Sequence, residues 1–124
     1  MEVIDTFAWV EYFAGSTRGQ KARPFIEKGD SITPSIVVAE FTDKYLREGI
    51  APEERLKFIR TKTMIPPLDD DVAEAAGRIS AERRAKVKGW GLADSCVLAT
   101  ARAKGARVVT GDGHFEDLGE TILI

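Results

Sequence analysis

The sequence predicts an α/β protein: a three-layer α/β/α sandwich built on a mainly parallel sheet of about five strands. Short apolar segments of strand length alternate along the chain with longer segments of helical periodicity. That alternation requires crossover connections, which join parallel strands and place helices on both faces of the sheet. The length of 124 residues fits one domain, residues 1–124, because two separately stable cores are not expected at this size.

The N-terminal part is expected to begin with a buried strand at residues 2–5 that passes directly into a helix at residues 6–13. Three apolar side chains share one face of that helix: Trp9, Val10 and Phe13. Glycine and serine make residues 15–19 a loop, and a second helix is expected at residues 21–27.

The middle of the chain continues with a short strand at residues 31–33. Ser35 is the expected N-cap of a helix whose body runs through residues 36–46, since serine hydroxyls accept bonds from free N–H groups at helix starts. A further helix begins near Pro52, because proline is tolerated in the first turn and the following two glutamates complement the helix dipole. Residues 64–67 are expected to be extended.

The C-terminal half is expected to begin with a long helix that starts at the three aspartates of residues 69–71. Its predicted buried face consists of Val72, Ala75, Ala76 and Ile79. Glycines interrupt the chain at residues 89–91, and a helix at residues 92–103 ends before Gly105. Two buried strands, residues 107–110 and 121–124, complete the set.

Composition narrows the class of protein. Apolar residues make up 44% of the chain and charged residues 31%, which is ordinary for a soluble globular domain, and no apolar run approaches the ~20 residues of a membrane helix. The N-terminus lacks the pattern of a signal peptide, and the single cysteine, Cys96, is expected to be a small buried residue, so we expect a cytoplasmic protein. The net charge of −2 disfavours nucleic-acid binding by bulk charge, but two bound divalent cations would make it positive.

Four acidic residues stand at positions that favour a common site. Asp5 and Asp112 follow predicted strands, and ligands of parallel sheets gather beyond the carboxyl ends of strands. Glu40 and Asp94 lie within apolar helical segments, where a carboxylate loses hydration unless it is paired, hydrogen-bonded or bound to a metal. Taken singly, Glu40 and Asp94 also fit a solvated helix face, and the other two fit helix caps.

Together the four acids indicate a site for a hard divalent cation. No lysine or arginine nearby in sequence pairs with them in an obvious way. Clustered carboxylates suit Mg²⁺ or Mn²⁺, and such cations activate water and stabilise the charge that develops at phosphorus. The chemistry that this pattern favours is phosphodiester hydrolysis.

The ordered set of motifs resembles the PIN-domain family over essentially the whole chain. The segments that carry the resemblance are Val3-Ile4-Asp5-Thr6, Val37-Val38-Ala39-Glu40-Phe41, Leu92-Ala93-Asp94-Ser95 and Val109-Thr110-Gly111-Asp112. The length is similar to that of VapC-type toxins of toxin–antitoxin pairs. By this resemblance Asp5, Glu40, Asp94 and Asp112 are the catalytic, metal-binding acids of an endoribonuclease that cuts single-stranded RNA with Mg²⁺ or Mn²⁺. The resemblance also implies a homodimer and a small antitoxin partner. Phe7 stands where a small residue is common in the family.

Other residues carry weaker expectations. Thr6 and Thr110 adjoin the acids and are expected to orient them, although helix capping and strand propensity explain both residues equally well. The basic residues expected to guide RNA phosphates are Arg18, Arg83, Arg84, Lys86 and Lys88; the alternative is a solvated helix end. Catalysis by His114, the only histidine, is disfavoured, and Trp90 is expected to pack within its loop rather than stack on a base. Glu11 is expected on a solvated helix face.

Competing functions fit less well. A haloacid-dehalogenase-like phosphatase needs a second aspartate at position 7, which is Phe7. A phospho-acceptor receiver domain needs an acidic pair after the first strand, and Ile4-Asp5-Thr6 has none. A housekeeping RNA-processing PIN nuclease and a non-catalytic α/β binding module both stay open as alternatives.

Overall fold

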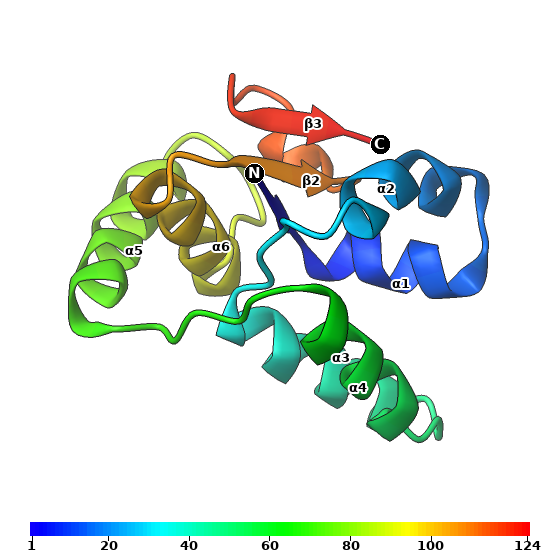
Figure 1. Cartoon of the computed structure of the whole chain (residues 1–124). Helices are drawn as coiled ribbons and strands as arrows, with labels where there is room; N and C mark the ends of the chain where they lie inside the picture. Colours follow the sequence, from blue (N-terminus) through cyan, green and yellow to red (C-terminus); the bar gives the residue numbers. More distant parts are fainter.

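The computed structural model describes all residues from 1 to 124. The chain forms three strands and six α-helices, and Figure 1 shows how they are arranged. In order, the elements are β1 (Glu2–Ile4), α1 (Thr6–Ala14), α2 (Thr17–Glu27), α3 (Ser35–Arg47), α4 (Glu53–Lys62), α5 (Asp70–Arg83), α6 (Leu92–Ala103), β2 (Arg107–Thr110), a 3₁₀ turn η1 (Gly113–Phe115) and β3 (Thr121–Leu123). The predicted bounds of α6 and β2 agree with the structure.

The sheet is parallel, as expected, but it has three strands rather than about five. Its order is β1-β2-β3, with Val3 opposite Val108 and Val109 opposite Ile122. The strand expected at residues 31–33 and the extended segment expected at residues 64–67 form only isolated parallel bridges, Val3 to Ile32 and Ile32 to Met64. Prolines explain why: Pro34, Pro66 and Pro67 lack the N–H that would extend either ladder.

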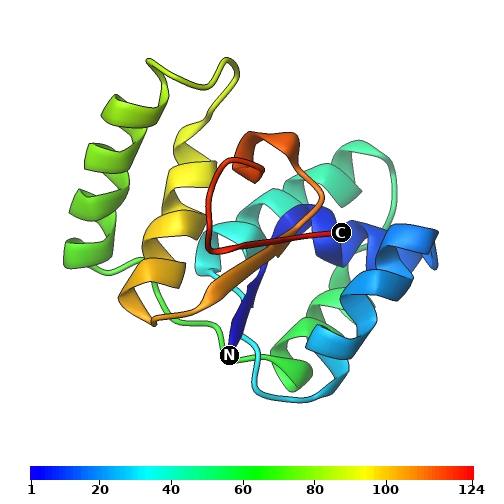
Figure 2. The same cartoon turned by 90° about the horizontal axis from the view of Figure 1, so that it is seen from above.

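Helices flank the strands on two sides. Figures 1 and 2 both place α5 and α6 on one side of the strands and α1 and α2 on the other. The α6 helix contacts both β1 and β2, and α5 packs along α6. Trp9, Phe41 and Phe115 are among the largest fully buried side chains of the core. No helix of the chain is both long enough and apolar enough to cross a membrane.

Several local expectations were wrong. The expected loop at residues 15–19 is half helix, because Ser16 accepts a hydrogen bond from Gly19 N at 3.0 Å and starts α2 at Thr17. Ser35 does not cap α3; its hydroxyl accepts a bond from Leu68 N at 3.1 Å, and Pro34 holds the cap position. In α5, Ala76 is buried, but Ala75 is exposed.

Candidate metal centre

Asp5 is the most deeply buried of the four acids, with 6% of its surface exposed. It caps α1 directly after β1, where Oδ1 accepts a hydrogen bond from Thr6 N at 2.8 Å. Its Oδ2 accepts a bond from Thr110 Oγ1, also at 2.8 Å. Burial raises the pKa of Asp5 from 3.8 to about 7; the two hydrogen bonds oppose that rise, and the charges of Glu40 and Asp94 add to it.

Glu40 and Asp94 approach the same region from α3 and α6. Glu40 Oε1 accepts a hydrogen bond from Thr6 Oγ1 at 2.8 Å, and Asp94 Oδ2 accepts one from Gly91 N at 3.0 Å. Both carboxylates are half-buried. Desolvation is the main cause that raises the pKa of each, and the nearby charge of Asp112 contributes in both cases.

Asp112 follows β2 and caps the short turn η1. Its Oδ1 accepts a hydrogen bond from His114 N at 2.9 Å, and its own N–H donates to Thr110 Oγ1 at 3.0 Å. The Thr110 hydroxyl therefore joins two acids, because it donates to Asp5 and accepts from the backbone of Asp112. In the same way Thr6 joins Asp5 to Glu40, through its N–H and its hydroxyl.

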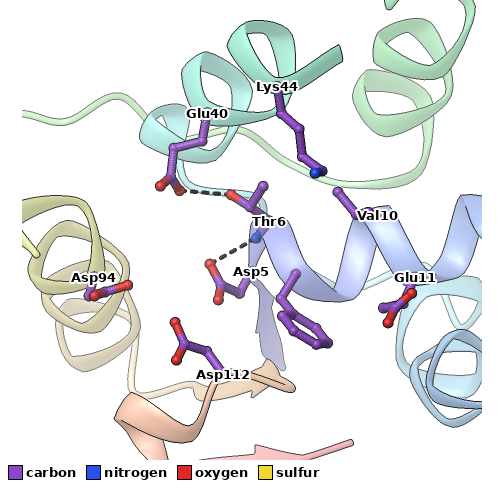
Figure 3. A pocket seen from close by; sticks show the side chains of 9 residues that line it. Asp5, Thr6, Val10, Glu11, Glu40, Lys44, Asp94 and Asp112 are labelled. Carbon is purple, nitrogen blue, oxygen red and sulfur yellow. Dashed lines mark hydrogen bonds between the residues drawn. The ribbon is translucent and has the colours of Figure 1, made fainter. Parts of the chain in front are cut away.

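The four carboxylates converge on one cavity of about 300 Å³ (Figure 3). Its other lining residues are Thr6, Phe7, Val10, Glu11 and Lys44. Lys44 is the only cation among them, and its Nζ lies 3.0 Å from Glu48 on the same helix. Negative charge at the cavity is thus concentrated and largely uncompensated by protein cations. The raised pKa values of Asp5, Glu40 and Asp94 fit a site for a divalent cation, which would stabilise the charged carboxylates.

Arg83 has a role that the sequence did not reveal. Its side chain is only 9% exposed and makes a two-pronged ion pair with Asp117, at 2.8 and 3.0 Å. Arg83 Nη2 also donates to the carbonyl of His114 at 2.8 Å, and the guanidinium lies 4.3 Å from the ring centre of Trp90. Arg83 therefore fixes the turn that follows Asp112 from inside the protein, and little of its side chain reaches the solvent.

The other basic residues remain on the surface. Arg84, Lys86 and Lys88 are exposed, and Lys86 makes only a 3.4 Å ion pair with Glu82, four residues earlier. Arg18 lies in the first turn of α2 rather than in a loop, with its guanidinium 5.5 Å from the ring centre of Phe7. Arg18 is thereby held beside a residue that lines the acidic cavity.

Trp90 packs inside its loop as expected. It is 4% exposed and donates from its indole nitrogen to Ser95 Oγ at 2.7 Å. Phe58 packs against the core as well. Neither residue is among the large apolar side chains that the fold leaves exposed.

The sequence analysis did not predict three features that lie in or beside the cavity. His114 lies beside two of the acids, with Nδ1 3.5 Å from Asp94 Oδ2 and 3.4 Å from Asp112 Oδ1. Lys44 follows Glu40 by one helical turn, a spacing that places both on one face of α3. Phe7 occupies the space next to Gly111, where any Cβ would lie only 2.2 Å from the Phe7 ring. Glycine at position 111 thus accommodates the large residue at position 7.

The protein therefore has an α/β fold in which four carboxylates surround one cavity at the edge of the sheet. The family model of the PIN domain matches residues 3–121, so the chain belongs to the PIN-domain family. No curated protein matches the sequence of this chain.

Solved structures with the same fold include toxins of VapBC systems. A toxin–antitoxin complex from Klebsiella pneumoniae has a TM-score of 0.80 at 18% identity, covering 98% of this chain and 96% of that one. VapC20 of Mycobacterium tuberculosis, described as a sarcin–ricin loop cleaving toxin, has a TM-score of 0.72 at 20% identity, covering 96% and 95%. DNA-bound VapBC from Salmonella typhimurium has a TM-score of 0.71 at 20% identity, covering 100% and 98%.

Proposed function

We propose that this protein is a metal-dependent endoribonuclease that hydrolyses phosphodiester bonds of single-stranded RNA. The observation that carries the proposal is the convergence of Asp5, Glu40, Asp94 and Asp112 on one cavity, with burial and mutual repulsion raising the pKa values of three of them. A divalent cation bound among these acids would offset their repulsion and stabilise their charged forms. The fold shared with an RNA-cleaving VapC supports RNA as the substrate.

The acids and the threonines at the cavity have separate roles in the proposed reaction. The four acids hold Mg²⁺ or Mn²⁺, while Thr6 and Thr110 fix the carboxylates of Asp5 and Glu40 by hydrogen bonds. A bound divalent cation supplies charge neutralisation at the scissile phosphate and lowers the pKa of a water molecule. The chain contributes a rigid frame, since the acids are fixed to β1, α3, α6 and the end of β2 rather than to a long loop.

We expect the purified protein to cleave single-stranded RNA in the presence of Mn²⁺ or Mg²⁺ and to lose all cleavage in excess EDTA. The reason is that the carboxylates alone repel both phosphate and hydroxide. A gel assay on a labelled RNA, with Mn²⁺ restored after EDTA as the control, measures this. Undiminished cleavage in excess chelator would contradict the metal assignment.

RNA guidance is proposed for the exposed basic residues Arg18, Arg84, Lys86 and Lys88, without Arg83. We expect Lys86→Gln with Lys88→Gln to weaken RNA binding and to reduce the slope of log affinity against log salt by about 0.7 for each lost phosphate contact. Lys21→Gln with Lys57→Gln is the matched control, because it removes the same charge from two exposed positions outside this segment. Equal slopes in the two double variants would assign Lys86 and Lys88 to an ordinary solvated surface.

Within this activity we propose the role of a toxin paired with a small antitoxin, because toxin–antitoxin complexes are among the structures that share the fold over nearly the full length. The homodimer is proposed on the family resemblance alone. A housekeeping RNA-processing role is the alternative. The neighbouring gene distinguishes them: a short partner with a DNA-binding N-terminal segment, which co-purifies with this chain and suppresses its cleavage, supports the toxin.

A further inference from the structure

His114 is held in place from three directions. Its backbone N–H donates to Asp112 Oδ1 at 2.9 Å, and its carbonyl accepts from the buried guanidinium of Arg83 at 2.8 Å. The far edge of its ring faces Gly89, where a Cβ would lie 3.0 Å from Nε2 and 3.3 Å from Cε1. The ring therefore has little freedom to turn toward Gly89, and its Nδ1 edge faces the acids.

The Nδ1 atom is buried and forms no hydrogen bond of regular length and angle within the chain. It lies 3.5 Å from Asp94 Oδ2 and 3.4 Å from Asp112 Oδ1, and the three donor atoms are all within 4.8 Å of one another. A buried polar atom without a partner is uncommon and calls for an explanation. Here the atom is aimed between two carboxylates that already belong to the candidate metal centre.

The spacing of these atoms matches that of neighbouring ligands on one cation. Metal–ligand bonds of roughly 2.1 Å, separated by angles between about 90° and 109°, place adjacent ligand atoms roughly 3.0 to 3.4 Å apart. The distance from Nδ1 to Asp112 Oδ1 lies at the upper limit of that range, and the distance to Asp94 Oδ2 lies just beyond it, so a cation would have to draw the three side chains inward. We infer that His114 Nδ1 is a nitrogen ligand of the cation held by Asp94 and Asp112, an inference that rests on the proposed function.

A nitrogen ligand changes which metal the site prefers. Oxygen-only sites suit Mg²⁺, whereas imidazole favours first-row transition metals, with affinity rising from Mn²⁺ onward. With His114 among its ligands, the centre binds Mn²⁺ in preference to Mg²⁺. Arg83 and Gly89 then act as positioning residues, because they hold the backbone and the ring of this ligand.

The test uses the fact that His114 is the only histidine of the chain. Protein without a histidine tag is loaded with Mn²⁺, and pulsed electron paramagnetic resonance records nuclear couplings to the metal. We expect an imidazole ¹⁴N coupling, which changes to a ¹⁵N coupling when only histidine is labelled with ¹⁵N. This measurement needs no variant, so it does not depend on how a substitution affects folding.

Metal titrations by calorimetry provide the second readout. His114→Phe keeps an aromatic ring beside Gly89 and removes the nitrogen, so we expect Mn²⁺ affinity to fall about tenfold or more, with a smaller change for Mg²⁺. Asp43→Asn, on the exposed side of α3, is the control and leaves both affinities unchanged. Mn²⁺ binding by the wild type without any histidine coupling would overturn this inference and leave the proposed nuclease standing. Failure of the wild type to bind Mn²⁺ at all would overturn both.

Discussion

Asp94→Asn is expected to abolish RNA cleavage while the metal-free protein stays as stable as the wild type or becomes more stable. In the wild type, burial and the charge of Asp112 raise the pKa of Asp94, so its ionised form is disfavoured in the fold. Asparagine keeps the shape and can still accept the hydrogen bond from Gly91 N. The substitution therefore removes an unfavourable charge, and it also removes an oxygen ligand from the proposed metal centre.

Denaturant melts in EDTA and in Mn²⁺, run on both proteins, measure this outcome. We expect Mn²⁺ to stabilise the wild type more than the variant, because fewer ligands remain in the variant to favour the folded state. Asp43→Asn controls for the loss of one carboxylate elsewhere, since Asp43 is exposed and paired only with Arg47. A structural acid with a buried partner would behave differently: its loss in EDTA would cost on the order of 3 kcal/mol, and the metal assignment of Asp94 would fail.

The sequence predicted the fold class well because periodicity and capping are local signals. The α6 helix lies between Gly91 and Gly105, and its predicted bounds match the structure. The segments around Ile32 and Met64, which form only β-bridges, show a limit of these local signals. Each segment is apolar enough for a strand, but strand length depends on how many N–H groups can pair with a neighbour, and nearby prolines remove them.

The candidate site shows the same division between local and distant information. Asp5 and Asp112 could be brought together from sequence, because the carboxyl ends of parallel strands lie at one edge of a sheet. The role of Arg83 could not be predicted from sequence, because its partners His114 and Asp117 are 31 and 34 residues away and only the fold brings them near. In sequence Arg83 belongs to a basic run, and its neighbour Arg84 does lie on the surface.

The stability of the metal-free protein is expected to fall as pH rises from 5 to 8. The pKa of Asp5 is about 7 in the folded protein, whereas the ordinary pKa of an aspartate is 3.8. Between those values the folded state holds a proton on Asp5 that the unfolded state has lost, so raising the pH favours unfolding. A rise of two pH units within that window lowers the free energy of unfolding by about 3 kcal/mol. The range starts at pH 5 so that Asp117 does not affect the slope. The pKa of Asp117 is lowered, so its contribution to stability changes only under more acidic conditions.

Chemical denaturation in EDTA across this pH range measures the slope, and Asp5→Asn is the matched variant. The amide does not titrate, so the slope should shrink to the part that Glu40 and Asp94 contribute, whose pKa values are also raised. Excess Mn²⁺ should reverse the trend in the wild type, because metal binding requires the ionised carboxylate and therefore strengthens with pH. A wild-type slope equal to that of Asp5→Asn would mean that Asp5 is ionised throughout this range. Burial would then have to be offset by the hydrogen bonds from Thr6 and Thr110, and the acids would form a preorganised anionic site even without metal.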